Sequence, residues 1–455
     1  MRKLLSLSAL VAIFAISCQQ EITNIPQTET NPANAETSFV RDYNQALAIA
    51  EEAVAMVDAS DTRSSKPRKI MSGQVVTNPV TRGGDTNEEP IMYIFNNEDN
   101  QGFTIIAADK SHPALIATTE LGNYTYGEPT GVEPFDLMME DVANNLRGLI
   151  PDVNYAIKYE IENEHDNPYG PLANVQWGVG TIYGSLYPDD VAYDEAAAIA
   201  QALISYQQNL TYTVTNPNSS DYGSTYLIAR NTLGAHFRYD HAKFQYTSCN
   251  TAIHDQIARL YLEIGYRLSQ NTSISLSNKT TSFPIVKVKS VLASFGVGTG
   301  AITSFIGNPI LPRTEANTFG GSYKEDSFIF CGTMSTAGSL PNGGRSHYWL
   351  ANGFNEYTYD YVTYTLNSIL DPSHPNPNGY TETARESRID YLLYFNWGFD
   401  GISNGWFHSG CFDMSERVED TSGNTINPNP TTSEYDYNFS NISFFSQLDP
   451  NPSAV

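Results

Sequence analysis

Basic residues are scarce in this chain of 455 residues. It has 25 lysines and arginines against 50 aspartates and glutamates, which gives a formal net charge of −25 at pH 7. This charge repels phosphate backbones and anionic lipid headgroups, and it excludes nucleic acid as a main partner. Charged residues make up 16% of the chain, whereas 40% is hydrophobic and 12% aromatic. The composition indicates a folded acidic protein, and the length predicts two or three domains.

Cysteine is also scarce. The chain has four cysteines and eight histidines, with no C-x-x-C motif and no cluster of the two residue types. Because zinc sites need such clusters, we expect no metal, and no motif indicates another cofactor. Three cysteines follow Cys18, so an exported form has at least one free thiol. The sequence leaves open which of these three form a disulfide: Cys249, Cys331 and Cys411.

Long apolar runs are missing as well. The apolar run over residues 4–16 follows two basic residues, and it is shorter than the ~20 residues that span a bilayer. This arrangement predicts an export signal peptide over residues 1–17. The small residue before Cys18 resembles the lipobox of bacterial lipoproteins, in which the cysteine is lipidated and becomes the first residue. We therefore expect a lipoprotein in the periplasm or at the cell surface, anchored to the membrane only through Cys18, with residues 18–36 as a flexible tether. The alternative is an ordinary signal peptide with an incidental cysteine.

Hydrophobic periodicity predicts a mixture of helices and strands. Residues 37–58 have apolar side chains at helical spacing, and residues 90–96 and 102–108 have the composition of two strands joined by a polar turn. Residues 153–171 are polar and contain two prolines, which suits a linker between domains. The pattern indicates an α+β fold. Its other predicted elements are helices over 135–149, 194–206 and 254–268, and strands over 327–330, 346–352, 390–396 and 405–407.

Three sequence motifs follow one another along the chain. They are an alanine-rich helix with Ala196, Ala198, Ala200 and Gln201, the run Gly344-Arg345-Ser346-His347-Tyr348-Trp349, and the run Asn396-Trp397-Gly398-Phe399-Asp400-Gly401. Together with Trp177-Gly178 and the N-terminal helix and hairpin, they resemble the streptopain-type cysteine peptidases, which have a papain-like fold. The resemblance implies a pro-domain related to Spi-type inhibitors over residues 37–152, a linker over 153–171 and a papain-like domain over 172–455.

The resemblance also implies where the catalytic groups would lie. The register of the alanine-rich helix puts Asp194 where the family has its nucleophilic cysteine. Val179 stands where the family has a glutamine that donates to the oxyanion, and valine has no donor. His347 is in the position of the catalytic histidine, and Asn396 and Trp397 would orient and cover its imidazole. A carboxylate that attacks an amide must expel a poor amine leaving group, so we do not expect Asp194 to cleave peptide bonds.

The expected function is that of a pseudopeptidase, which binds a peptide or protein in the cleft between the helix of Asp194 and the strand of His347. Two other classes stay open. One is an active hydrolase of the family with an unconventional nucleophile, and the other is a surface adhesion or scaffold lipoprotein. A third possibility is that residues 37–150 inhibit a sibling enzyme in trans, since the pro-domains of the family resemble free-standing inhibitors. Because a chain without the thiol has no need to release its pro-segment, we expect the full-length form to persist. The sequence indicates neither the ligand nor the oligomeric state.

Overall fold

The computed structural model describes most of the chain between residues 39 and 448. The segment Phe39–Val455 forms one compact unit. The predicted signal peptide and tether, with Cys18, lie outside the described residues, as do Val179, Cys249 and Cys411. The described ranges are 39–60, 67–77, 90–148, 157–169, 186–187, 193–205, 210–228, 239–240, 245–246, 251–272, 283–300, 302–306, 328–335, 345–366, 380–408 and 438–448.

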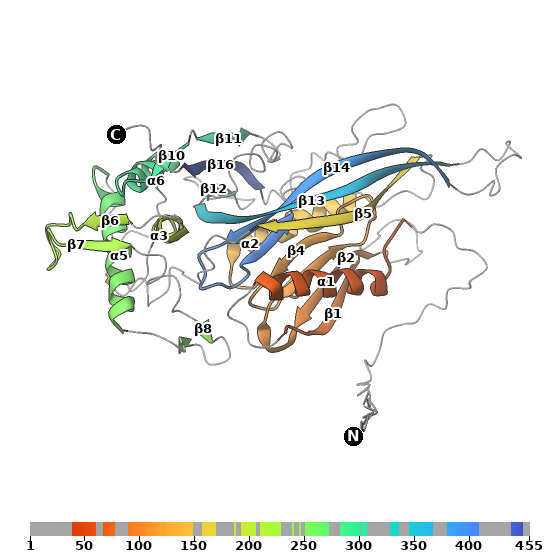
Figure 1. The fold of residues 1–455 in the computed structure, drawn as a ribbon, viewed down its shortest axis with the longest axis horizontal. Helices are drawn as coiled ribbons and strands as arrows, with labels where there is room; N and C mark the ends of the chain where they lie inside the picture. The colour runs from red at the N-terminus through yellow and green to blue at the C-terminus, as the bar shows by residue number, and fades with distance from the viewer. Residues whose placement is uncertain are drawn as a thin grey trace, which may run out of the picture. The chain divides into compact units, whose positions relative to one another are not determined.

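Most of the described strands belong to one antiparallel sheet of twelve strands (Figure 1). Ten of them lie in the order β1 (Ile70–Thr77), β2 (Pro90–Asn97), β3 (Phe103–Ala107), β4 (Leu115–Thr119), β15 (Gly405–His408), β14 (Tyr380–Asn396), β13 (Arg345–Leu366), β12 (Phe328–Ser335), β16 (Asn438–Leu448) and β10 (Gly298–Thr299). The other two are β11 (Thr303–Ile306), which pairs with β16, and β5 (Ile157–Tyr169), which pairs with β13.

Helices and short hairpins complete the described elements. The helices are α1 (Tyr43–Ser60), α2 (Glu133–Gly148), α3 (Asp194–Ser205), α5 (Thr251–Ser269) and α6 (Ile285–Ala293), with a 3-10 turn η1 (Glu98–Asn100). The hairpins join β6 (Leu210–Thr213) to β7 (Thr225–Ile228) and β8 (Tyr239–Asp240) to β9 (Gln245–Tyr246). This mixture of helices and antiparallel strands confirms the predicted α+β class. None of the helices in the described part is long and apolar enough to cross a membrane.

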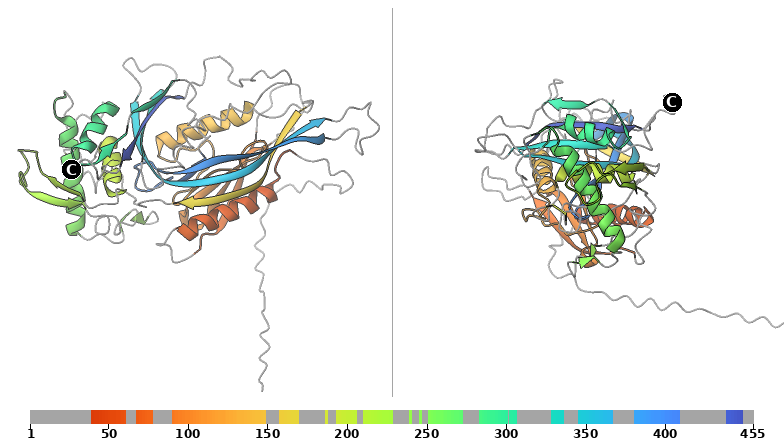
Figure 2. Two further views of the ribbon diagram at one scale, coloured as in Figure 1. Left: turned by 45° about the horizontal axis from the view of Figure 1, so that its top comes forward. Right: turned by 90° about the vertical axis from the view of Figure 1, so that its left-hand side faces the viewer.

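Residues 39–148, here called the N-terminal unit, place one helix on each face of their strands (Figure 2). Strand β2 is buried on both faces, and its side chains alternate between them. Tyr93 and Phe95 contact the face of α1, whereas Met92 and Ile94 belong to the cluster that includes Phe135 of α2. This explains why β2 reads as a continuous apolar run, since a strand covered on both faces has no solvent side.

Strands β14 and β15 extend the sheet of the N-terminal unit, whose two faces are both covered by apolar side chains. β15 pairs with β4, and β14 lies next to β15. Phe395 and Phe407 pack into the cluster of α2, whereas Tyr394 and Trp406 pack with Val57 of α1. The N-terminal unit therefore shares both of its apolar layers with strands that lie nearly 300 residues further along the chain.

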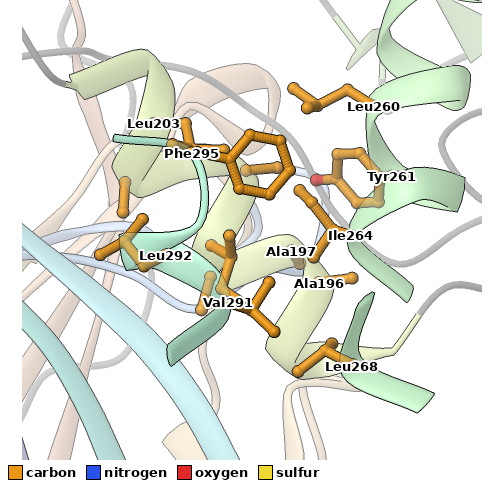
Figure 3. Packing of buried hydrophobic residues seen from close by; sticks show 14 of the residues in the cluster. Ala196, Ala197, Leu203, Leu260, Tyr261, Ile264, Leu268, Val291, Leu292 and Phe295 are labelled. Atoms are coloured by element: carbon orange, nitrogen blue, oxygen red, sulfur yellow. The ribbon is translucent and has the colours of Figure 1, made fainter. Parts of the chain in front are cut away.

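A second core forms where three helices meet (Figure 3). Ala196 and Ala197 of α3 lie against Ile264 of α5, and α6 adds Val291 and Leu292. The alanine-rich sequence allows this, because small side chains let neighbouring helices approach closely. Two residues of β13, Tyr348 and Leu350, complete the cluster. Helix α3 is thereby fixed against the strand that carries His347.

The predicted linker over residues 153–171 is wrong in its secondary structure. It contains β5, which pairs with β13 from Ile157 opposite Thr365 to Tyr169 opposite Phe354. The polar residues and two prolines suggested a linker, but the residues from 157 to 162 alternate apolar and charged, as half-buried strands do. Its partner β13 and the strand on the other side of β13, β14, are also longer than predicted, at 22 and 17 residues.

Candidate functional site

Helix α3 begins at Asp194, which the sequence resemblance predicts to stand in the nucleophile position. Its first turn is held by the Tyr193 carbonyl, which accepts from the N–H groups of Ala196 and Ala197 at 3.0 and 3.1 Å. The side chain of Asp194 lies outside the described residues. A Cβ placed on Gly398 would lie 3.6 Å from the Cβ of Ala197, so the start of α3 adjoins the turn that follows Trp397.

His347 lies near the start of β13 and is 1% exposed. Its Nε2 is 3.0 Å from the backbone oxygen of Trp397. Because a carbonyl oxygen can only accept, Nε2 carries the proton, and in the neutral ring Nδ1 is then the basic nitrogen. The ring stacks on Trp349, with 6.2 Å between centroids and 10° between planes, and Phe399 lies 5.5 Å away. The imidazole is therefore fixed in one orientation and one tautomer.

The turn after β14 supplies the partner of His347. Within it, Asn396 Oδ1 accepts from the Gly398 N–H at 3.1 Å, and Asn404 Oδ1 accepts from the Trp397 N–H at 3.0 Å. Gly398 has a φ of +82°, a conformation that favours glycine. These two side chains hold the peptide groups on either side of Trp397, so the carbonyl that faces His347 is fixed by hydrogen bonds within its own loop.

The prediction that Asn396 and Trp397 orient and cover the imidazole stays a prediction, and the structure shows the following contacts. Asn396 shapes the turn, and the backbone oxygen of Trp397 orients the imidazole. The indole of Trp397 lies 5.5 Å from that of Trp349, which is itself stacked on His347. Sequence reasoning missed Asn404 as a site residue. Its signal was an asparagine just before a glycine in a loop, a common turn position that by itself does not indicate a contact with residue 397.

A further contact ties the histidine strand to α3. Asn352 of β13 is buried, and its Nδ2 donates to Ser205 Oγ at 3.1 Å, at the last residue of α3. In this structure the residue holds the far end of the helix, away from His347 by five positions along the strand.

Among the described residues one cysteine, Cys331, lies on β12, the strand that pairs with β13 at His347. Strand pairing puts Gly332 opposite His347 and Cys331 opposite Tyr348. Since neighbouring strand positions face opposite sides of a sheet, position 331 belongs to the face of Tyr348. Among the described residues no group of three His, Cys, Asp or Glu side chains could hold a metal ion.

Comparison with known families concerns the first part of the chain. Residues 33–145 match a family model described as Spi protease inhibitor. The N-terminal unit resembles the Spi protease inhibitors. This match confirms the predicted Spi-type pro-domain, whose helix, hairpin and second helix are α1, β2 with β3, and α2. No curated protein sequence matches the chain.

The solved structures that are similar to this chain include two of interpain A. One is a mutant prointerpain A fragment from Prevotella intermedia, which is 16% identical with a TM-score of 0.41, and the match covers 84% of this chain and 100% of that one. The other is the active wild-type interpain A cysteine protease of Prevotella intermedia, which is 14% identical with a TM-score of 0.31. That match covers 61% of this chain and 94% of the other.

Proposed function

We propose that this protein is an exported, lipid-anchored member of the streptopain-like group that has lost peptidase chemistry and binds a peptide or protein segment beside His347. The observation that carries the proposal is the contrast between two parts of one site. The imidazole of His347 is held as a general base requires, with Nε2 on the Trp397 carbonyl. The helix that should present the nucleophile begins with Asp194.

The replacement of a thiol by a carboxylate at this position suits the fold. A negative charge at a helix N-terminus is stabilised by ~0.3–1 kcal/mol through the helix dipole. Acyl transfer, however, needs a nucleophile that is activated by the base and a leaving group that the base can protonate. Asp194 meets the structural requirement and not the chemical one, which supports binding without turnover.

The first experiment measures cleavage. The purified protein, with a reductant present, is expected to leave casein intact. The double variant Asp194→Cys with Val179→Gln restores the two family residues, and it is expected to cleave casein in an alkylator-sensitive way. Turnover by the unmodified protein that a cysteine-directed alkylator abolishes would contradict the proposal and favour the active hydrolase.

The second experiment measures binding. Phe399 lies 5.5 Å from the His347 ring and is partly buried, so a ligand beside the imidazole would contact it. Phe399→Ala is expected to weaken the binding of unstructured casein peptides by roughly ten-fold, from lost apolar contact. Leu227→Ala is the control, because Leu227 is 53% exposed on the hairpin of β6 and β7. If both variants weaken peptide binding equally, or if neither weakens it, the result would favour a scaffold or adhesion role.

A further inference from the structure

Asn404 connects two parts of the molecule that the sequence assigned to different domains. Its side-chain oxygen accepts from the Trp397 N–H at 3.0 Å, and its backbone oxygen accepts from the N–H of Glu120 at 2.9 Å. Next to it, the N–H of Ser403 donates to the Leu121 oxygen at 3.2 Å. Asn404 therefore bonds in two directions. Its backbone oxygen binds the turn after β4 in the N-terminal unit, and its side chain binds the N–H of Trp397, the residue whose carbonyl accepts from His347.

The surroundings leave this connection little freedom. Asn404 is 1% exposed and Ser403 is fully buried. The next residue, Gly405, lies opposite Thr119 in the pairing of β15 with β4, where a side chain would collide with the backbone of β4. A residue that is buried and bonded on both sides transmits a shift of one neighbour to the other, because close-packed interiors do not absorb such shifts.

We infer that Asn404 is a positioning residue, through which the N-terminal unit sets the orientation of the His347 imidazole. The chain of contacts runs from the backbone at Glu120 and Leu121 to Asn404, from Asn404 to the Trp397 peptide, and from its carbonyl to Nε2 of His347. The N-terminal unit is thus a structural part of the histidine site in the full-length protein. The inference holds for a binding site and for a hydrolase alike.

The test follows the Nε2–H proton of His347 by NMR in full-length protein with nitrogen-labelled histidine. His347→Gln assigns the signal among the eight histidines. Asn404→Ala removes the acceptor of the Trp397 N–H, and hydrogen exchange of the His347 Nε2–H is expected to become about five-fold faster. Asn404→Asp keeps an acceptor oxygen for the Trp397 N–H but places a carboxyl group at a buried position, so its exchange is expected to be slower than that of Asn404→Ala and faster than that of the unmodified protein.

A matched control separates positioning from general loss of stability. Asn96 Oδ1 accepts from the Tyr124 N–H at 2.8 Å, a contact of the same kind within the N-terminal unit. Asn96→Ala is expected to lower the thermal midpoint and to leave the His347 exchange rate unchanged. A second variant, Gly405→Ala, forces β4 from β15 and is expected to accelerate the exchange as Asn404→Ala does. The inference is overturned if Asn404→Ala and Gly405→Ala leave the His347 signal unaltered, or if Asn96→Ala changes it equally.

Discussion

Replacing Gly405 by alanine is expected to separate the N-terminal unit from the C-terminal strands. An added Cβ would lie 2.5 Å from Thr119 Cα and closer still to the Thr118 oxygen, distances that real Cβ atoms essentially never show. Both obstacles are backbone atoms, so no side chain can turn away to relieve the collision. Overpacking of this kind costs ~1–3 kcal/mol, and each hydrogen bond lost between β4 and β15 adds ~1 kcal/mol. We expect the free energy of unfolding to fall by about 2–4 kcal/mol.

The assay for this variant is urea unfolding followed by tryptophan fluorescence. Three of the four tryptophans are fully buried and lie on strands or turns near the junction: Trp349, Trp397 and Trp406. Gly73→Ala is the control, since its Cβ would meet the hydroxyl end of Tyr43, a side chain that can move. The control is expected to lose less than half as much stability. An unchanged unfolding midpoint for Gly405→Ala, or equal losses in the two variants, would refute the reasoning about the junction.

Three further predictions concern the described cores. Burial, with Asp42 nearby, raises the pKa of Tyr93 to about 12 from 10.0. The native state then keeps a proton that the unfolded chain loses, so stability falls as the pH rises from 10 towards 12, and urea midpoints should fall less in Tyr93→Phe. Glu263→Gln removes the charge that pairs with Arg267 at 2.8 Å and is expected to cost ~3–5 kcal/mol; an unchanged thermal midpoint contradicts this. Phe39→Ala, which empties a site between two tyrosine rings of β13 and β14, is expected to cost ~3–5 kcal/mol by the same assay, with Phe39→Leu losing less.

Several elements followed from local sequence patterns. The hairpin of β2 and β3 and the helix that starts at Asp194 were predicted close to their observed bounds. The first helix was expected within residues 37–58, and α1 spans Tyr43–Ser60. Strand β5 was missed, because its polar residues and prolines suggested a linker and its partner β13 lies nearly 200 residues away. The extensions of β13 and β14 beyond the motif residues were missed for the same reason, since strand pairing between distant segments leaves only a weak local signal.

The amino-acid sequence by itself determined the acidic composition, the order of the motifs and the identity of the residue that begins α3. These are properties of residue type and of spacing over a few turns, which short-range periodicity encodes. Only the tertiary structure decided that the Trp397 carbonyl orients His347, that Asn404 holds the Trp397 N–H, and that β4 pairs with β15. Such contacts join residues whose separation in sequence is unrelated to their distance in space, so they depend on how completed elements pack against one another.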